Sequence, residues 1–193
     1  MEETKKEIAR EDCIKTYGGR YFSPVEPEAE NIDIGDIAHA LSLLCRGNGH
    51  VTQFFSVGQH CLNCAAEAEA RGYSRRVCLA CLLHDASEAY MTDVTRPLKR
   101  HLPEYKKCES ILLDMIYEKY LESPLTEEEQ QQVKQIDDDM LYYDLLVLLN
   151  EPQEREKPEI RIELKYEFVP FEIVEARYLE AFYQLAGGVG EGK

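Results

Sequence analysis

The sequence contains no run of 18 apolar residues and no charged segment that leads into an apolar one, since it begins MEETKKEIARED. These absences exclude a membrane-spanning helix and a secretory signal, so we expect a soluble, cytoplasmic protein without a membrane partner. Basic residues are also scarce: 22 Lys and Arg stand against 37 Asp and Glu, for a formal charge of −15. Binding a nucleic acid polymer through its phosphates requires a basic face, so that function is excluded. A small phosphorylated substrate stays open, because a metal ion reverses the local charge.

The chain also lacks internal repeats and low-complexity tracts, and its 193 residues are enough for one domain with a sizeable core. We expect a single domain over residues 1–193, with its core at about 33–150. An N-terminal arm and hairpin would occupy 1–32, and a C-terminal strand and helix would occupy 151–193.

Cysteine is present in an odd number, seven, without a secretory signal, which indicates reduced thiols and no disulfide framework. The pairs Cys61-x-x-Cys64 and Cys78-x-x-Cys81 resemble a four-thiolate zinc site. Both pairs lie in runs of helical periodicity and lack the glycine-rich turns of a zinc knuckle. We therefore interpret them as core thiols, and the zinc site is the alternative.

Apolar residues recur at spacings of three and four over most of the chain, which predicts an all-α fold. Ser56 and Ser74 are expected N-caps, and Thr126 with Glu129 forms a capping box. The expected helices cover residues 33–45, 56–71, 74–85, 103–120, 126–150 and 171–186.

Two segments interrupt the helical pattern. Gly18-Gly19 between aromatic residues predicts a small hairpin, and residues 160–168 alternate apolar and charged side chains as a strand does. We expect these segments to pair as a minor sheet. Residues 1–16 are expected to form a short helix or a frayed arm, and the glycine-rich end of the chain is expected to be a tail.

The stretch His84-Asp85-Ala86-Ser87-Glu88, after the apolar run 77–83, carries the densest chemistry in the sequence. His84 and Asp85 can hold one metal ion if the end of the helix faces a cavity. Glu88, one turn further on, is a carboxylate free to move a proton. Alternatively, His84 complements the helix dipole and the two acids are solvated.

A helical wheel separates the acids near Asp137. With Val133 at zero, Asp137 falls at about 40°, inside the apolar stripe, whereas Asp138 and Asp139 fall near 140° and 240°, outside it. A carboxylate within an apolar stripe must be paired, protonated or bound to a metal. Asp144, at about 20°, is expected to support a metal ligand, and Asp138 and Asp139 are expected to be solvated.

His60 also lies inside an apolar stripe, so four buried donors are candidates for one divalent ion: His60, His84, Asp85 and Asp137. Their nitrogen and oxygen atoms suit Mn, Co, Fe, Ni, Zn or Mg, and the sequence does not choose among these ions.

These residues resemble the H…HD…D pattern of the HD superfamily of metal-dependent phosphohydrolases, over roughly residues 33–150. Two further stretches, HDASE followed by Thr92-Asp93, Pro97 and Lys99, and later VKQID ending at Asp137, are similar to the bacterial HD-domain 5′-deoxynucleotidases. The resemblance implies an all-helical HD domain and hydrolysis of a (deoxy)nucleoside 5′-monophosphate or another small phosphomonoester.

The resemblance also implies the roles of individual residues. Glu88 and Asp93 would act around the attacking water and the leaving group, and Arg46, with Lys99, would hold the phosphate. In that family a tryptophan follows the arginine, and this chain has Gly47 there and no tryptophan at all. Alarmone hydrolases carry a second acid where this chain has Ala89, and the GYP motif of cyclic dinucleotide phosphodiesterases is absent.

Two other functions fit the same residues. A dNTP triphosphohydrolase would share the metal ligands and differ in the length of its pocket, and a non-catalytic nucleotide sensor would use the pocket for binding alone. The intact Glu88 and Asp93 favour an enzyme. The oligomeric state is open, and a homodimer is one alternative.

Overall fold

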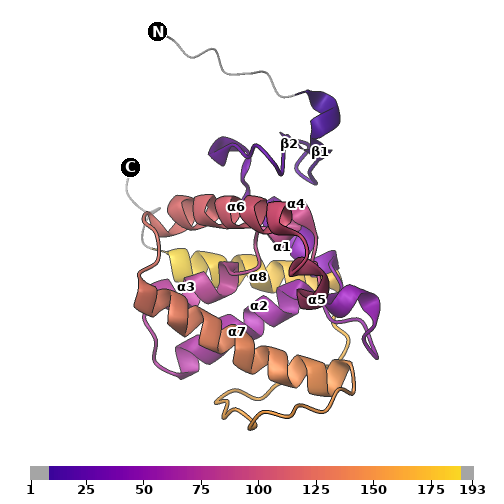
Figure 1. Ribbon diagram of the computed structural model, residues 1–193. Helices are drawn as coiled ribbons and strands as arrows, with labels where there is room; N and C mark the ends of the chain where they lie inside the picture. The colour runs from indigo at the N-terminus through magenta and orange to yellow at the C-terminus, as the bar shows by residue number, and fades with distance from the viewer. Residues whose placement is uncertain (1–8, 188–193) are drawn as a thin grey trace.

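The computed structural model describes residues 9–187, and this part of the chain is mostly helical with one small hairpin, as the sequence predicts (Figure 1). The α-helices are α1 (Ile34–Leu43), α2 (Val57–Ala70), α3 (Arg75–Leu83), α4 (Glu88–Met91), α5 (Arg96–Lys99), α6 (Pro103–Leu121), α7 (Glu127–Leu148) and α8 (Phe171–Ala186). Short 3₁₀ turns occupy Arg10–Asp12, Ala29–Asn31 and Arg46–Gly49. The remainder of the expected N-terminal arm, residues 1–8, and most of the expected tail, residues 188–193, lie outside the described residues.

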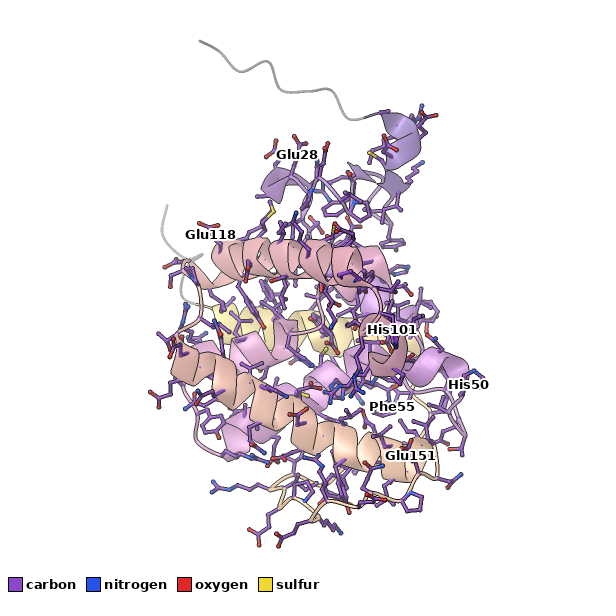
Figure 2. All side chains as sticks on the ribbon, in the orientation of Figure 1. Glu28, His50, Phe55, His101, Glu118 and Glu151 are labelled. Atoms are coloured by element: carbon purple, nitrogen blue, oxygen red, sulfur yellow. The ribbon has the colours of Figure 1, made fainter. Side chains whose placement is uncertain are left out.

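Helices α2 and α3 pack against each other at the centre of the fold. Helix α8 covers them together with α1, α6 packs on α3, and α7 packs across both α2 and α3 (Figure 1). Side chains fill the space that the ribbon leaves between α7 and the helices behind it (Figure 2). The apolar core is therefore continuous from α1 to α8.

Side-chain caps fix where the helices begin, because they satisfy backbone N–H groups that have no partner within the helix. Asp33 accepts hydrogen bonds at the start of α1, and Ser74 does so at α3. Ser56 and Thr126 each form a complete capping box, at α2 and α7. The expected N-termini of these four helices are confirmed.

The hairpin at Gly18-Gly19 is confirmed. Strands β1 (Ile14–Lys15) and β2 (Tyr21–Phe22) pair antiparallel, with Ile14 opposite Phe22. Gly19 has a φ of 85° in the turn between them, a conformation that glycine adopts without steric cost.

The strand expected at residues 160–168 is wrong. The described part of the chain holds one sheet, formed by β1 and β2 alone. The buried carboxylate of Glu67 accepts the backbone N–H groups of Arg161, at 2.9 Å, and Ile162, at 3.1 Å, so these donors are not free for a ladder. Ile160 and Leu164 pack against the core. The alternating pattern therefore arises from a chain that lies along a protein surface and presents one side to it.

Asp139 is also not solvated, contrary to the expectation. It is 4% exposed, and its carboxylate accepts hydrogen bonds from Arg71 at 2.9 Å and from Gln135 at 2.8 Å. Arg71 lies just after α2, against the side of α7 that the helical wheel marks as polar. A buried ion pair replaces apolar packing there, and a wheel built on apolar residues cannot detect it.

No helix among residues 9–187 is long and apolar enough to span a lipid bilayer.

Candidate metal centre

Helix α2 presents His60 in its first turn, where the capping box of Ser56 and Gln59 sets the start of the helix. The imidazole is fully buried, and each ring nitrogen faces a carboxylate of α7. Nδ1 lies 2.8 Å from Asp144 Oδ2, and Nε2 lies 3.2 Å from Asp137 Oδ1. Asp137 and Asp144 are seven residues apart, or about two turns, so both project from one face of α7.

His84 and Asp85 reach the same place through a turn, because α3 ends at Leu83 and α4 begins only at Glu88. The helix was expected to run through Asp85, and it ends two residues earlier, at Leu83. His84 Nε2 lies 3.3 Å from Asp85 Oδ2 and 3.6 Å from Asp137 Oδ1. The structure thus brings His60, His84, Asp85 and Asp137 together from α2, the α3–α4 turn and α7.

The outer nitrogen of each histidine fixes the tautomer of the ring. His84 Nδ1 lies 2.8 Å from the backbone carbonyl of Cys81, and His60 Nδ1 lies 2.8 Å from the carboxylate of Asp144. These oxygens accept hydrogen bonds and cannot donate them, so both Nδ1 atoms carry the hydrogen. In the neutral rings, the Nε2 lone pairs then point toward Asp85 and Asp137, the arrangement of metal-binding histidines.

The distances within this group fit a shared ion. Ligand atoms at roughly 2.1 Å from one ion are separated by about 3.0 Å at a right angle and about 3.4 Å at a tetrahedral angle. The nitrogen–oxygen separations here are 3.2, 3.3 and 3.6 Å. His84 Nε2 is moreover a buried atom without a hydrogen-bond partner. The donor set and the orphaned nitrogen both fit a divalent cation.

Charge in the site points the same way. Burial and Arg46 lower the pKa of His60, yet its pKa is raised well above the ordinary value, because the neighbouring Cys64, Asp144 and Asp137 outweigh them. The pKa of His84 is likewise raised despite burial, chiefly by Asp85. Negative charge therefore exceeds positive charge here, and a proton or a metal ion must balance it.

Arg46, expected to bind phosphate, lies at the edge of this group. Its guanidinium is 3.2 Å from Asp144 Oδ2 and 3.4 Å from Asp85 Oδ2, and only 12% of the side chain is exposed. Burial opposes its charge, but Asp144 and Asp85 raise the pKa above the ordinary value, so Arg46 is a permanent cation. The next residue, Gly47, has a φ of 58°, a left-handed conformation that would strain a tryptophan.

Tyr166 completes the surroundings of Asp144, and the sequence analysis did not single it out. Its hydroxyl donates to Asp144 Oδ1 at 3.1 Å, and its ring packs against Phe55 with 5.2 Å between centroids. Burial raises the pKa of Asp144, but His60, Arg46 and Tyr166 together hold it below the ordinary value. Asp144 therefore stays ionised and holds His60 in place, and its support of a metal ligand stays a prediction.

Glu88 and Asp93, the expected catalytic acids, lie beside the group without belonging to it. Glu88 is 4% exposed and its Oε2 has no hydrogen-bond partner. Burial, followed by the charges of Asp85 and Asp93, raises the pKa of Glu88 well above its usual range, and burial and Asp85 also raise the pKa of Asp93. Between them, Thr92 has a φ of 71°, which is rare for a β-branched residue and typical of strain at functional sites.

Two further cations border the acids. Lys99 lies 3.9 Å from Glu88 Oε1, but its nearer partner is Glu109, at 2.6 Å. Arg96 donates to Asp137 Oδ2 at 3.0 Å and to Asp138 Oδ1 at 2.9 Å, with half of its side chain exposed. The sequence around Arg96 does not indicate that its side chain contacts the acids of α7. That contact can be seen only in the structure.

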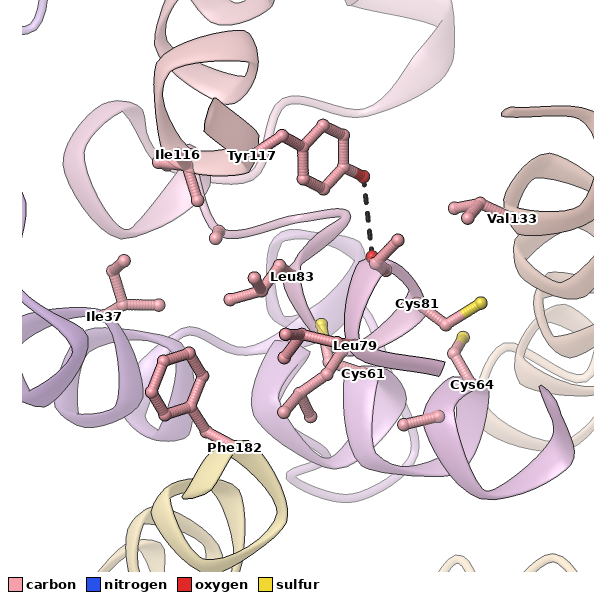
Figure 3. Close-up of a cluster of buried hydrophobic side chains, with 14 of the residues drawn as sticks. Ile37, Cys61, Cys64, Leu79, Cys81, Leu83, Ile116, Tyr117, Val133 and Phe182 are labelled. Carbon is pink, nitrogen blue, oxygen red and sulfur yellow. Dashed lines mark hydrogen bonds between the residues drawn. The ribbon is translucent and has the colours of Figure 1, made fainter. Parts of the chain in front are cut away.

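All seven cysteines are free, and Cys61, Cys64, Cys78 and Cys81 lie in the core, as expected. Among residues 9–187, no group of possible metal ligands combines two of them, which argues against the four-thiolate site. The described residues hold two groups of three possible ligand atoms within 4.8 Å of one another, and each contains one thiol: His60 with Cys64 and His84, and Cys61 with His84 and Asp85. Figure 3 shows the sulfur atoms of Cys64 and Cys81 turned toward the same space, near Val133 of α7.

No family model matches the chain. It is 40% identical over 107 residues to the uncharacterized protein YfdR of Escherichia coli (strain K12), which is 55% of this chain and 57% of that protein. It is also 40% identical over 86 residues to an uncharacterized protein of Rhodobacter capsulatus, covering 42% of this chain and 43% of the relative. The chain thus spans about half the length of these curated relatives, whose names state no activity.

Proposed function

We propose that this protein is an HD-type metal-dependent phosphohydrolase that acts on a (deoxy)nucleoside 5′-monophosphate or another small phosphomonoester. One observation carries the proposal: His84 Nε2 is buried without a hydrogen-bond partner between Asp85 and Asp137, where His60 Nε2 also points. The resemblance of the H…HD…D and HDASE residues to HD nucleotidases supplies the reaction class. The metal identity stays open among Mn, Co, Fe, Ni, Zn and Mg.

In this proposal His60, His84, Asp85 and Asp137 hold the ion. A divalent cation at that position supplies positive charge that stabilises the phosphoryl group in the transition state and makes water more acidic. Asp144 and the carbonyl of Cys81 keep both rings in the binding tautomer, and loss of such outer partners typically weakens metal binding 10–100-fold.

Glu88 is the proposed general base. Its unpartnered Oε2 is free to accept a proton from water, and the raised pKa makes the ionised carboxylate a stronger base than an exposed glutamate. Asp93, whose pKa is also raised, would assist the attack or protonate the leaving oxygen. Lys99, near Glu88, would keep a positive charge beside the reacting groups.

Arg46 is the proposed phosphate clamp. A guanidinium has five N–H donors, and contacts to Asp85 and Asp144 engage two of its nitrogens, which leaves donors for phosphate oxygens. The same contacts hold the guanidinium beside the metal ligands. Phosphate bound there would meet the cation and Arg46 at once.

The test is a panel of nucleotides assayed with Mn²⁺, Co²⁺ and Mg²⁺, with separate detection of phosphate and triphosphate. We expect phosphate release from monophosphates by the wild type, and a fall of roughly 10²–10⁴-fold for Glu88→Gln with metal content unchanged. Asp138→Asn, which alters a carboxylate outside the ligand group, is the matched control. Triphosphate release would instead identify a dNTP triphosphohydrolase, and binding without turnover would identify a nucleotide sensor.

A further inference from the structure

One thiol lies against a ring nitrogen that the proposed function assigns to the metal. Cys64 follows His60 by four residues on α2, so both side chains leave the same face of the helix. Cys64 Sγ is 3.4 Å from His60 Nε2, and both residues are buried. Neither the resemblance nor the H…HD…D pattern includes this cysteine.

The distance fits two ligands of one ion. With a metal–sulfur bond of about 2.3 Å and a metal–nitrogen bond of about 2.1 Å, the two atoms are roughly 3.1 Å apart at a right angle and roughly 3.6 Å apart at a tetrahedral angle. The observed 3.4 Å lies between these values. Cys64 Sγ and one ring nitrogen from each of His60 and His84 all lie within 4.8 Å of one another.

A second observation points to a ligand at this position. His84 belongs to the same group, and its Nε2 atom is buried with no hydrogen-bond partner. A thiol can donate its hydrogen to His60 Nε2 only while that lone pair is free. Once an ion takes the lone pair, the thiol must either turn away within a closed core or lose its proton and bind.

We propose that Cys64 is a thiolate ligand of the metal centre, which thereby selects a sulfur-accepting ion such as Zn²⁺, Co²⁺ or Fe²⁺ over Mg²⁺. This inference rests on the metal site of the proposed function. When the metal–sulfur bond forms, the sulfur–hydrogen bond breaks and one proton passes to solvent, with no change in oxidation state. Thiolate is a soft ligand, and Mg²⁺ binds oxygen, so the selectivity follows from the donor.

The experiment is a titration of Co²⁺ into the metal-free, full-length protein, followed by absorption spectroscopy. The wild type should develop an intense near-ultraviolet sulfur-to-cobalt charge-transfer band that saturates at one ion per chain. Cys64→Ser should lose this band and keep the weak visible bands of bound cobalt. Cys78→Ala and Cys81→Ala are matched controls, since each removes a buried thiol that belongs to neither group of possible metal ligands, and both should keep the band.

Competition gives an independent measurement. The preference for Zn²⁺ over Mg²⁺ should fall in Cys64→Ser by roughly tenfold or more, because even an outer partner of a ligand contributes 10–100-fold to affinity. Circular dichroism would confirm that each variant is folded. A wild type that binds cobalt without the band, or a band that survives in Cys64→Ser, would overturn the proposal.

The two proposals fail separately. A cobalt band that depends on Cys64, in a protein that hydrolyses no phosphate ester, would support the thiolate ligand and reject the phosphohydrolase. Phosphate release by a cobalt-loaded protein without the band would support the phosphohydrolase and reject the thiolate ligand.

Discussion

Asp137 is the carboxylate whose Oδ1 atom faces the Nε2 atoms of both histidines, at 3.2 and 3.6 Å. We expect Asp137→Asn to lose most bound metal, because the neutral amide oxygen is a weaker ligand and its NH₂ group would face the ring nitrogens. Elemental analysis of the purified variant measures this loss. Asp138→Asn should keep its metal, since Asp138 pairs with Arg96 and Lys134. Equal metal content in the two variants would contradict the ligand assignment.

In the proposed metal site Asp144 would act on the ion through His60, so a change there should weaken metal binding without abolishing it. Asp144→Asn can present an N–H to His60 Nδ1, which disfavours the binding tautomer, and we expect the dissociation constant to rise roughly 10–100-fold. Calorimetric titration with Zn²⁺ measures the change. Tyr166→Phe removes one hydrogen bond to the other oxygen of Asp144 and should alter the constant much less. An unchanged constant in Asp144→Asn would be the opposite result.

For single residues, the sequence predicts burial where a polar residue follows the helical period of the apolar ones. It misses residues whose burial or contact depends on a side chain elsewhere in the sequence. His60, Asp137 and Asp144 lie within apolar stripes, where a buried polar group needs an explanation, and the structure groups them. Asp139 lies off the stripe yet is buried, because Arg71 neutralises it. The sequence predicts Cys64 to be a core residue, and its contact with His60 Nε2 depends on the rotamers of both side chains.

At the scale of whole elements, one buried carboxylate, that of Glu67, holds the segment that follows α7 against α2. Glu67 has no exposed surface, and it accepts N–H groups from Arg71, Arg161 and Ile162. Glu67→Gln brings an NH₂ group against these donors, so we expect a loss of about 3 kcal/mol in the free energy of unfolding.

Urea denaturation measures this loss. Glu69→Gln, at an exposed position on the same helix, is the matched control and should change the free energy by less than about 0.5 kcal/mol. A loss of the same size in both variants would show that Glu67 does not hold the segment.

Helix boundaries were predictable because caps are local: Ser56, Ser74 and Thr126 act within four residues of themselves. The end of α3 was not, because His84 and Ser87 keep helical dihedral angles, and the helix is interrupted by hydrogen bonds that span three residues, from Ala86 to Leu83 and from Glu88 to Asp85. The prediction of a strand at residues 160–168 was wrong for another reason. An alternation of apolar and charged residues indicates a chain with one buried side. Only the hydrogen-bond partners of its backbone show whether that chain is a β-strand or an irregular segment on the surface.

For the whole molecule, the proposed metal ligands connect helices that are far apart in the sequence. An ion bound to them stabilises the folded state alone, by about 2.7 kcal/mol at a free concentration of 100 times the dissociation constant. We expect chelation to lower the melting temperature and added Zn²⁺ or Co²⁺ to restore it. Calorimetry measures the shift, and His84→Ala, which lacks a ligand, should show none. An equal shift in His84→Ala would indicate that the ion binds elsewhere.

The hydrogen bond from Tyr166 to Asp144 also bears on the order in which the site is assembled during synthesis. His60 and His84 leave the ribosome before Asp137 and Asp144, and Tyr166 follows them. Helix α8, which packs on α1, α2 and α3, follows Tyr166. Until those last segments emerge, the paired imidazoles and thiols around α2 stay uncovered in the nascent chain. In that interval they are open to stray metal ions and to chaperones, and the fold closes over them only after α8 has emerged.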